Sequence, residues 1–455
     1  MRRTLVIFTL VFLVIPNPSG AQSLFDDISG SSGNGYKLGG FIRSGIYFNK
    51  PDKSTGIPVS FADLSLNTEA GNGSTYKAYA DLRYRYASEY GKIVNAPVLR
   101  EAWAAWYTPL TELKAGKQII KWSNMDFFRL QDVISPRNDL YRSFDSADRD
   151  LGNVSLNFSL SPVDKVSFQA LIIPRFRPSV LYTEFMDMPG LIEIKEHTFK
   201  DNGTLSYGLR AEVYLKNFSA SISYFDGYNP LPGLRLDTLT IQTEDNSYTV
   251  SLEERPFKIR TLSAGVEFML GNNIIRTEAI WSDPDKDYKQ KEFVMLPEIK
   301  WAAGFEHFFG DLQVVLEYSG KYIMDFEESA FDPVLPDESS FFEFGSLPPE
   351  QIFEYTRLQI GSFNRLYNYQ LHEYSHYAGL RLAYEKGLAT FSPSVNILYN
   401  ITAEEYMLNP VLKINPSDNL EIIAGAEIYN GTGDSLFDMI NERLNSIYTG
   451  VRIDF

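Results

Sequence analysis

Most of the chain consists of short runs in which apolar and polar residues alternate. In the last run, Ile447, Val451 and Ile453 fall on one side of the alternation, and Arg452 and Asp454 fall on the other. A period of two residues places alternate side chains on opposite faces of a β-strand. The pattern therefore predicts a protein built mainly from strands that each have one apolar face.

Counting these runs gives about 18 strands. The predicted strands are 36–49, 58–70, 75–87, 98–107, 112–118, 153–160, 165–172, 206–215, 218–225, 258–270, 274–281, 298–309, 312–322, 373–384, 388–399, 405–414, 419–429 and 445–455. Tight, turn-rich connections such as 216–217 and 310–311 alternate with long polar stretches near 119–152, 173–205, 226–257 and 324–370. Transmembrane barrels of bacteria have short periplasmic turns and long extracellular loops. We therefore predict an all-β protein with a single closed antiparallel transmembrane barrel.

A large soluble β-sandwich or propeller is the alternative fold, because its strands also alternate in polarity. It does not predict the asymmetry between long and short connections, nor aromatic residues gathered near strand ends. Here Trp106, Tyr384 and Tyr399 lie near the ends of runs, as in the aromatic girdles of membrane barrels. The pattern favours the membrane barrel.

The first residues resemble a secretory signal. Arg2 and Arg3 precede an apolar segment at 4–15, and Ser19, Gly20 and Ala21 form a small-residue cleavage site. We expect a signal peptide at 1–21, a periplasmic spacer at 22–35 and the barrel at 36–455. The predicted location is the bacterial outer membrane.

Composition excludes several kinds of chemistry. The chain of 455 residues has no cysteine, which rules out disulfides, zinc–thiolate sites and thiol catalysis. Its formal net charge of −16 argues against a nucleic-acid partner, because nucleic-acid binding requires a basic surface.

Residues 372–376 read His-Glu-Tyr-Ser-His, the order of a zinc-protease motif. That motif functions on a helix, whereas here it opens a predicted strand. In a strand, positions four apart are separated by about 13 Å, which is too far to share one ion. We interpret these residues as the polar end of a long loop, and we predict no cofactor, no metal site and no enzymatic activity.

Ionisable residues are frequent on the predicted inward face. The candidate pore-lining residues are Lys37, Arg43, Lys77, Asp81, Arg83, Arg85 and Arg452. Two interpretations remain open: paired charges that fill the lumen, and a pore wall with a basic side that favours anions. On the second interpretation, replacing Arg83 and Arg85 by alanine shifts ion selectivity toward cations.

The polar stretch at 119–152 is the candidate constriction loop, because it interleaves acidic and basic residues and follows the fifth predicted strand. A loop folded inward here would narrow the lumen. The alternative is an external loop that is stabilised by its own ion pairs. The candidate residues of this loop and its junction with the strand are Gln118, Trp122, Asp126, Arg129, Asp132 and Arg137.

The same region resembles porin-like outer-membrane barrels, including the alginate-export type and related uncharacterised barrels. The matching segments are Arg-Glu-Ala at 100–102, Gly-Lys-Gln at 116–118 followed by Trp122, and Asp-Val-Ile-Ser-Pro at 132–136. The chain departs from these families at Ser123, where glycine is usual, and at Ser135, where asparagine is commoner. The resemblance implies that Gln118, Trp122 and Asp132 lie at the strand–loop junction near the constriction.

Two classes of function follow. The first is an outer-membrane channel for passive passage of small hydrophilic solutes, including anionic or saccharide solutes. The second is a non-conducting barrel that serves adhesion, surface structure or uptake of hydrophobic compounds. The expected partners are outer-membrane lipid, a small solute, and the barrel-assembly machinery, which is expected to recognise the last strand through Phe455.

Overall fold

The computed structural model describes residues 35–49, 56–72, 74–181, 191–195, 205–242, 247–336, 347–384, 390–433 and 435–455. Within these residues, 18 strands form one antiparallel sheet that closes on itself. Its strands are β1 (Gly35–Asn49), β2 (Gly56–Gly71), β3 (Tyr76–Glu89), β4 (Lys92–Tyr107), β5 (Thr111–Gln118), β6 (Asn153–Val163), β7 (Val166–Ile173), β9 (Ser206–Leu215), β10 (Phe218–Tyr228), β13 (Lys258–Leu270), β14 (Asn273–Pro284), β15 (Glu298–Phe309), β16 (Leu312–Ile323), β17 (Tyr374–Tyr384), β18 (Phe391–Asn400), β19 (Glu405–Ser417), β20 (Leu420–Asn430) and β21 (Ser446–Asp454). Each corresponds to a strand predicted from the sequence, so the predicted barrel is confirmed. The predicted signal peptide and nearly all of the predicted spacer lie outside the described residues.

The barrel is closed by pairing of the last strand with the first. The register of β1 and β21 runs from Phe41 opposite Asp454 to Phe48 opposite Ile447. Beyond it, the backbones of Gly40 and Phe455 exchange two hydrogen bonds of 2.9 and 3.0 Å. Closure leaves no unpaired edge strand in the sheet.

The two faces of the wall differ as the alternation predicts. On β3, Leu82, Tyr84 and Tyr86 are exposed on the outside, whereas Arg83 and Arg85 are buried on the inside. An apolar outer face is what a bilayer requires of a barrel. Among the described residues, no helix combines the length and the apolar content needed to cross a membrane.

Leu82 offers a direct test of this assignment. We expect Leu82→Arg to destabilise the folded barrel by about 2–4 kcal/mol, because it places a charge against lipid near the middle of a strand. Denaturant titration in lipid vesicles measures the loss, with Leu82→Ala as the control. If Leu82→Arg were no more destabilising than Leu82→Ala, the assignment of the two faces would be reversed.

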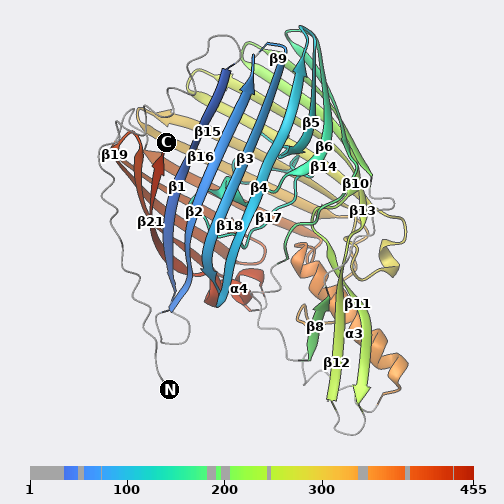
Figure 1. Ribbon diagram of the computed structural model, residues 1–455. Helices are drawn as coiled ribbons and strands as arrows, with labels where there is room; N and C mark the ends of the chain where they lie inside the picture. Colours follow the sequence, from blue (N-terminus) through green and yellow to red (C-terminus); the bar gives the residue numbers. More distant parts are fainter. Residues whose placement is uncertain are drawn as a thin grey trace.

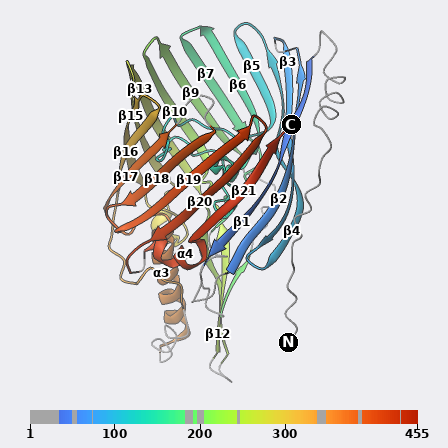
Figure 2. The ribbon, with the colours of Figure 1, turned by 90° about the vertical axis from the view of Figure 1, so that its left-hand side faces the viewer.

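The two ends of the barrel are unlike. Tight turns join the strands at the end where β1 starts and β21 ends, which is the upper end in Figures 1 and 2. The long connections gather at the opposite end, although the turns between β3 and β4 and between β18 and β19 are also short there. The helix α4 (Leu436–Leu444) lies at this end, where Phe437, Ile440 and Leu444 pack with Tyr429 of the wall.

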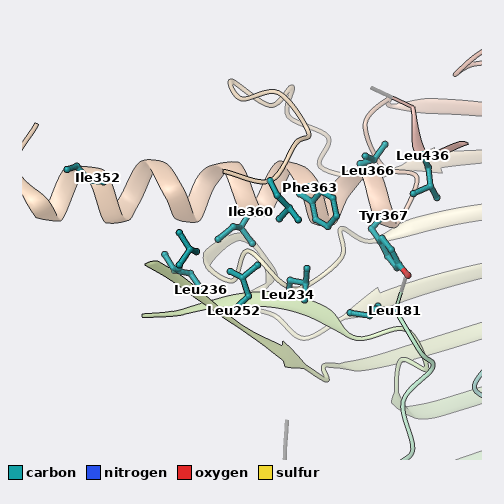
Figure 3. Packing of buried hydrophobic residues seen from close by; sticks show 12 residues of the cluster. Leu181, Leu234, Leu236, Leu252, Ile352, Ile360, Phe363, Leu366, Tyr367 and Leu436 are labelled. Atoms are coloured by element: carbon teal, nitrogen blue, oxygen red, sulfur yellow. The ribbon is translucent and has the colours of Figure 1, made fainter. Parts of the chain in front are cut away.

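A small unit projects from the long-loop end. It consists of the strands β8 (Ile192–Lys195), β11 (Gly233–Gln242) and β12 (Ser247–Arg255) and the helix α3 (Pro349–Tyr367). Leu234 and Leu252 of the sheet pack against Ile360 and Phe363 of the helix, and these side chains are almost fully buried (Figure 3). This unit therefore has an apolar core of its own outside the barrel.

The long polar stretches near 173–205, 226–257 and 324–370, in which the sequence pattern predicted no strand or helix, supply the elements of this unit. The apolar positions of its three strands are spread over two of these stretches, whereas α3 does carry a pattern of its own, which the prediction overlooked. In α3, Ile352, Thr356, Ile360, Phe363 and Tyr367 recur at helical spacing and are buried. Packing between distant segments, rather than local periodicity, stabilises these elements.

Candidate functional site

The connection between β5 and β6, residues 119–152, folds into the barrel and contacts its wall on several sides. We call it the inner loop. On one side it is attached to two glutamates of the wall. The carboxylate of Glu317 accepts hydrogen bonds from the backbone N–H groups of Asp126, Phe127 and Phe128 at 2.7, 2.9 and 3.0 Å. Glu278 accepts from the backbone N–H of Asn124 at 2.9 Å. Charged acceptors make strong hydrogen bonds, so these two side chains fix the path of the loop.

Asp148 attaches the inner loop to the opposite part of the wall. Its carboxylate meets Arg43 of β1 at 2.5 Å, Arg83 of β3 at 2.6 Å and Arg100 of β4 at 3.2 Å. Burial by itself would raise the pKa of Asp148, but the positive charges of Arg43 and Arg83 outweigh it and hold that pKa well below the usual range for a carboxyl. The group is therefore an anion at the centre of an arginine cluster.

A second attachment lies close to the seam of the barrel. Arg142 and Arg149 of the inner loop both pair with Glu427 of β20, and the Arg149 contact measures 3.0 Å. Arg142 also donates to the backbone carbonyl of Leu444, the last residue of α4. Ion pairs therefore attach the loop to strands on both sides of the β1–β21 closure.

Inward-facing glycines of the wall make room for side chains of the loop. Phe144 lies against Gly45 and Gly450, so a Cβ at either position would overlap its ring. A Cβ on Gly379 would lie 2.7 Å from the ring of Phe127. Glycine within a strand weakens it, and often marks close approach of another group. The glycines of the wall therefore leave the space that the loop occupies in this position.

Three of the predicted junction residues shape the start of the inner loop. Gln118 ends β5 and donates to the carbonyl of Ser155 at 3.1 Å. The carboxylate of Asp132 accepts from the backbone N–H groups of Trp122 at 2.6 Å and Ser123 at 2.9 Å. The Trp122 ring donates to Gln169 of β7 at 2.7 Å. These contacts hold the chain as it turns inward.

The other three predicted loop residues make ion pairs. Asp126 lies 3.7 Å from Arg276 and 3.5 Å from Arg381, both on the wall. Arg129 and Arg137 instead stay within the loop, where they pair with Asp150 at 3.5 and 2.8 Å. Asp126 therefore bridges loop and wall, whereas the two arginines stabilise the loop itself.

The predicted pore-lining residues fall into two groups, and the first consists of three buried arginines and the buried Asp81. Arg43 and Arg85 both pair with Asp63, at 2.8 and 3.0 Å, and Arg83 pairs with Asp81 at 3.2 Å. The relative exposures of Arg43, Arg83 and Arg85 are 2%, 9% and 3%. The inner loop covers these arginines, and each of them is paired with a carboxylate. They therefore do not form an open basic wall, which the second interpretation from the sequence requires.

The remaining predicted pore-lining residues lie nearer the tight-turn end. Lys77 pairs with Glu69 at 3.0 Å, and Arg452 pairs with Asp454 at 2.7 Å. Lys37 lies opposite Glu69 in the register of β1 and β2, on the inward face. These three side chains are more accessible than the arginine cluster.

Sequence reasoning did not single out Phe144, Glu427 or the wall glycines. The available signal was glycine on the inward face in the middle of strands, at Gly45 and Gly379 for example. That signal indicates close approach of some other group, but it does not say which part of the chain supplies it.

The His-Glu-Tyr-Ser-His segment leads into β17. His376 lies on the outward face of that strand, and its Nδ1 is 2.8 Å from the hydroxyl of Tyr318. Within the described part of the chain, no group of three histidine, aspartate or glutamate residues is placed to hold a metal ion.

The barrel is similar to solved structures of bacterial outer-membrane proteins. The structure matches Pseudomonas aeruginosa OccK9 (OpdG) with a TM-score of 0.52 at 9% identity, covering 92% of this chain and 97% of that one. It matches Acinetobacter baumannii OccAB3 with a TM-score of 0.51 at 11% identity, covering 92% and 99%. The chain has the fold of a porin-like outer-membrane barrel. At this identity the likeness concerns the fold, and it supports the porin-like part of the sequence resemblance but not the alginate-export part.

A third similar structure is Pseudomonas aeruginosa OccK2 (OpdF) in complex with glucuronate, with a TM-score of 0.51 at 9% identity, covering 92% of this chain and 97% of that one. No protein-family model and no curated protein matches the sequence.

Proposed function

We propose that this protein is an outer-membrane channel through which small hydrophilic solutes pass passively. The observation that carries the proposal is the inner loop, which is hydrogen-bonded to opposite sides of a closed 18-stranded wall. A barrel of this strand number encloses an aqueous lumen unless other elements fill it. A seated loop that narrows such a lumen limits the size and charge of what passes.

The residues of the lumen away from the arginine cluster support passage of polar solutes. Lys114 of β5, Glu212 of β9, Glu267 of β13 and Arg381 of β17 are partly exposed and point inward. A lumen lined by ionisable side chains remains hydrated, which favours hydrophilic over apolar solutes. Nothing in this arrangement calls for a catalytic group.

Conductance in a planar bilayer tests the proposal. We expect stable unitary current steps after insertion of the purified protein, and swelling of protein-containing liposomes in solutions of small sugars. Absence of both signals, with the barrel shown to be folded by its circular dichroism, would support the alternative. That alternative is a non-conducting barrel, and the extensive burial of charged groups under the inner loop is the observation that favours it.

Ion selectivity distinguishes a basic wall from paired charges. We expect the double variant Arg83→Ala/Arg85→Ala to conduct more than the wild type, because Arg83 pairs with Asp148 and Arg85 donates to the carbonyl of Arg142, so that both hold the inner loop. The carboxylates that lose these partners should shift the reversal potential toward cations together with that increase in conductance. Reversal potentials in a salt gradient measure this. A clear shift toward cations at unchanged conductance would instead show that these arginines line the permeation path.

The solute and the partners belong to the proposal as well. The similar OccK2 structure contains glucuronate, which agrees with a small sugar acid as one class of solute. Outer-membrane lipid would cover the apolar outer face. Recognition by the barrel-assembly machinery would use the last strand, in which Phe455 is backbone-paired to Gly40.

A further inference from the structure

A cavity of about 350 Å³ lies between the inner loop and the wall formed by β4–β9. Its volume is at the lower end of the range for small-molecule sites. Trp103 and Tyr214 supply ring surfaces, and Gln118, Asn157 and Gln169 supply amides. The rest of its lining is mainly charged side chains and the start of the loop, including Trp122, so the exposed surface of the cavity is almost entirely polar.

Every cation that lines this cavity pairs with a carboxylate, and Lys121 shares its partner Asp150 with Arg129 and Arg137 of the inner loop. Lys114 pairs with Glu112 at 3.3 Å, and Arg210 pairs with Glu212 at 2.6 Å. Lys121 pairs with Asp150 at 2.8 Å. A charged solute would have to displace one of these partners, and separating a partly buried ion pair is costly. The cavity therefore favours a solute without net charge.

Lys114 and Glu101 are further engaged by neighbours of the cavity. The ammonium of Lys114 lies 4.5 Å from the centre of the Trp103 ring. The carboxylate of Glu101 accepts from the backbone N–H of Ile119 at 3.0 Å. These contacts fix the orientation of the charged groups, so that they present defined polar edges to a solute.

Asn157 of β6, like Gln118 and Arg210, lines the cavity with a polar atom whose hydrogen bonding is incomplete among the described residues. It is about nine-tenths buried, with 8% exposure, and within the described residues its side-chain oxygen has no hydrogen-bond partner. A buried amide without partners costs free energy. Because the two ends of an amide exchange by rotation, Asn157 is able either to donate to a hydroxyl or to accept from one.

We propose that this cavity is a binding subsite for an uncharged, hydroxyl-rich solute of monosaccharide size. A hydroxyl both donates and accepts hydrogen bonds. It can therefore bond to the side-chain amide of Asn157 and to the ion-paired side chains of the lining without breaking any ion pair. This inference rests on the proposed function, because it names the solute class of the same lumen.

Saturation-transfer NMR on the purified barrel in micelles tests the subsite without requiring conduction. The probes are D-glucose and D-glucuronate, which share a ring and differ in charge. We expect transfer to glucose, and weaker transfer to glucuronate at pH 7. Asn157→Leu should weaken glucose binding about tenfold, equivalent to one lost hydrogen bond of about 1.4 kcal/mol.

Asn396→Leu is the matched control, because Asn396 is an inward amide of β18 that lies against Asn409 instead of the cavity. If Asn157→Leu fails to fold, Tyr214→Ala, which is at the rim of the cavity, takes its place. Absence of transfer to glucose in the wild type, or equal binding by Asn157→Leu and wild type, would overturn the subsite. Failure of the channel itself shows separately, as absence of conductance in the bilayer.

Discussion

Asp148→Ala should release one side of the inner loop and raise the single-channel conductance severalfold. The substitution leaves Arg43 and Arg83 buried without the carboxylate that both of them contact. Removing one partner of a buried ion pair costs about 3–5 kcal/mol, which is large compared with the stability of a single loop conformation. Hydration then stabilises the two arginines more than contact with the inner loop does.

Two measurements check this expectation. Conductance in a planar bilayer reports the width of the lumen, and trypsin reports access to the arginines at 129 and 137 in the inner loop. Asp145→Ala is the matched control, because Asp145 caps the short 3-10 helix Ser146–Arg149 in the same loop. Equal conductance and equal protease resistance in Asp148→Ala and the wild type would mean that the arginine cluster does not hold the loop.

Gly379→Val should displace the inner loop on the other side of the lumen. A Cβ at this position would lie 2.7 Å from the ring of Phe127, and each nearby atom that it would meet belongs to that residue. Valine is well suited to a β-strand, so the wall itself should tolerate the change. We expect an increase in conductance of the same kind as in Asp148→Ala.

A second substitution shows whether the effect passes through Phe127. In Gly379→Val/Phe127→Ala the ring is absent, so the backbone of residues 126–128 can remain on Glu317. We expect conductance to return toward the wild-type value. If the double variant conducts as much as Gly379→Val alone, steric displacement of Phe127 is not the cause. Contacts that share one element are coupled, so the two effects should not add.

Together, the hydrogen bonds to the wall glutamates and the ion pairs with the wall arginines hold the inner loop in one position against the wall. Its two sides use different chemistry: on one side, wall carboxylates accept backbone N–H groups, and on the other, wall arginines surround one loop carboxylate. Attachments at opposite parts of the wall define the direction in which the loop crosses the lumen. In the proposed channel, a loop held in this way would set a fixed restriction, and solute size and polarity would then decide what passes.

The sequence by itself determined the barrel. Each strand faces lipid on one side and the lumen on the other, so every strand, from β1 to β21, carries a period of two that can be read locally. For the same reason the inward direction of Arg43, Arg83 and Arg452 followed from alternation alone. The mixed charges at 119–152 also indicated that this connection differs from the other long loops.

Only the tertiary structure decided what the inward residues do. Asp148, Arg43 and Arg83 are far apart in the chain, and alternation cannot show that one loop carboxylate neutralises both arginines. The same holds for Phe144 against Gly45, and for the outer unit, in which Leu234 and Phe363 share a core. Pairing and packing across the lumen depend on which segments meet after the barrel closes. The alternating pattern of a strand, in contrast, depends only on the lipid and the lumen that its two faces contact.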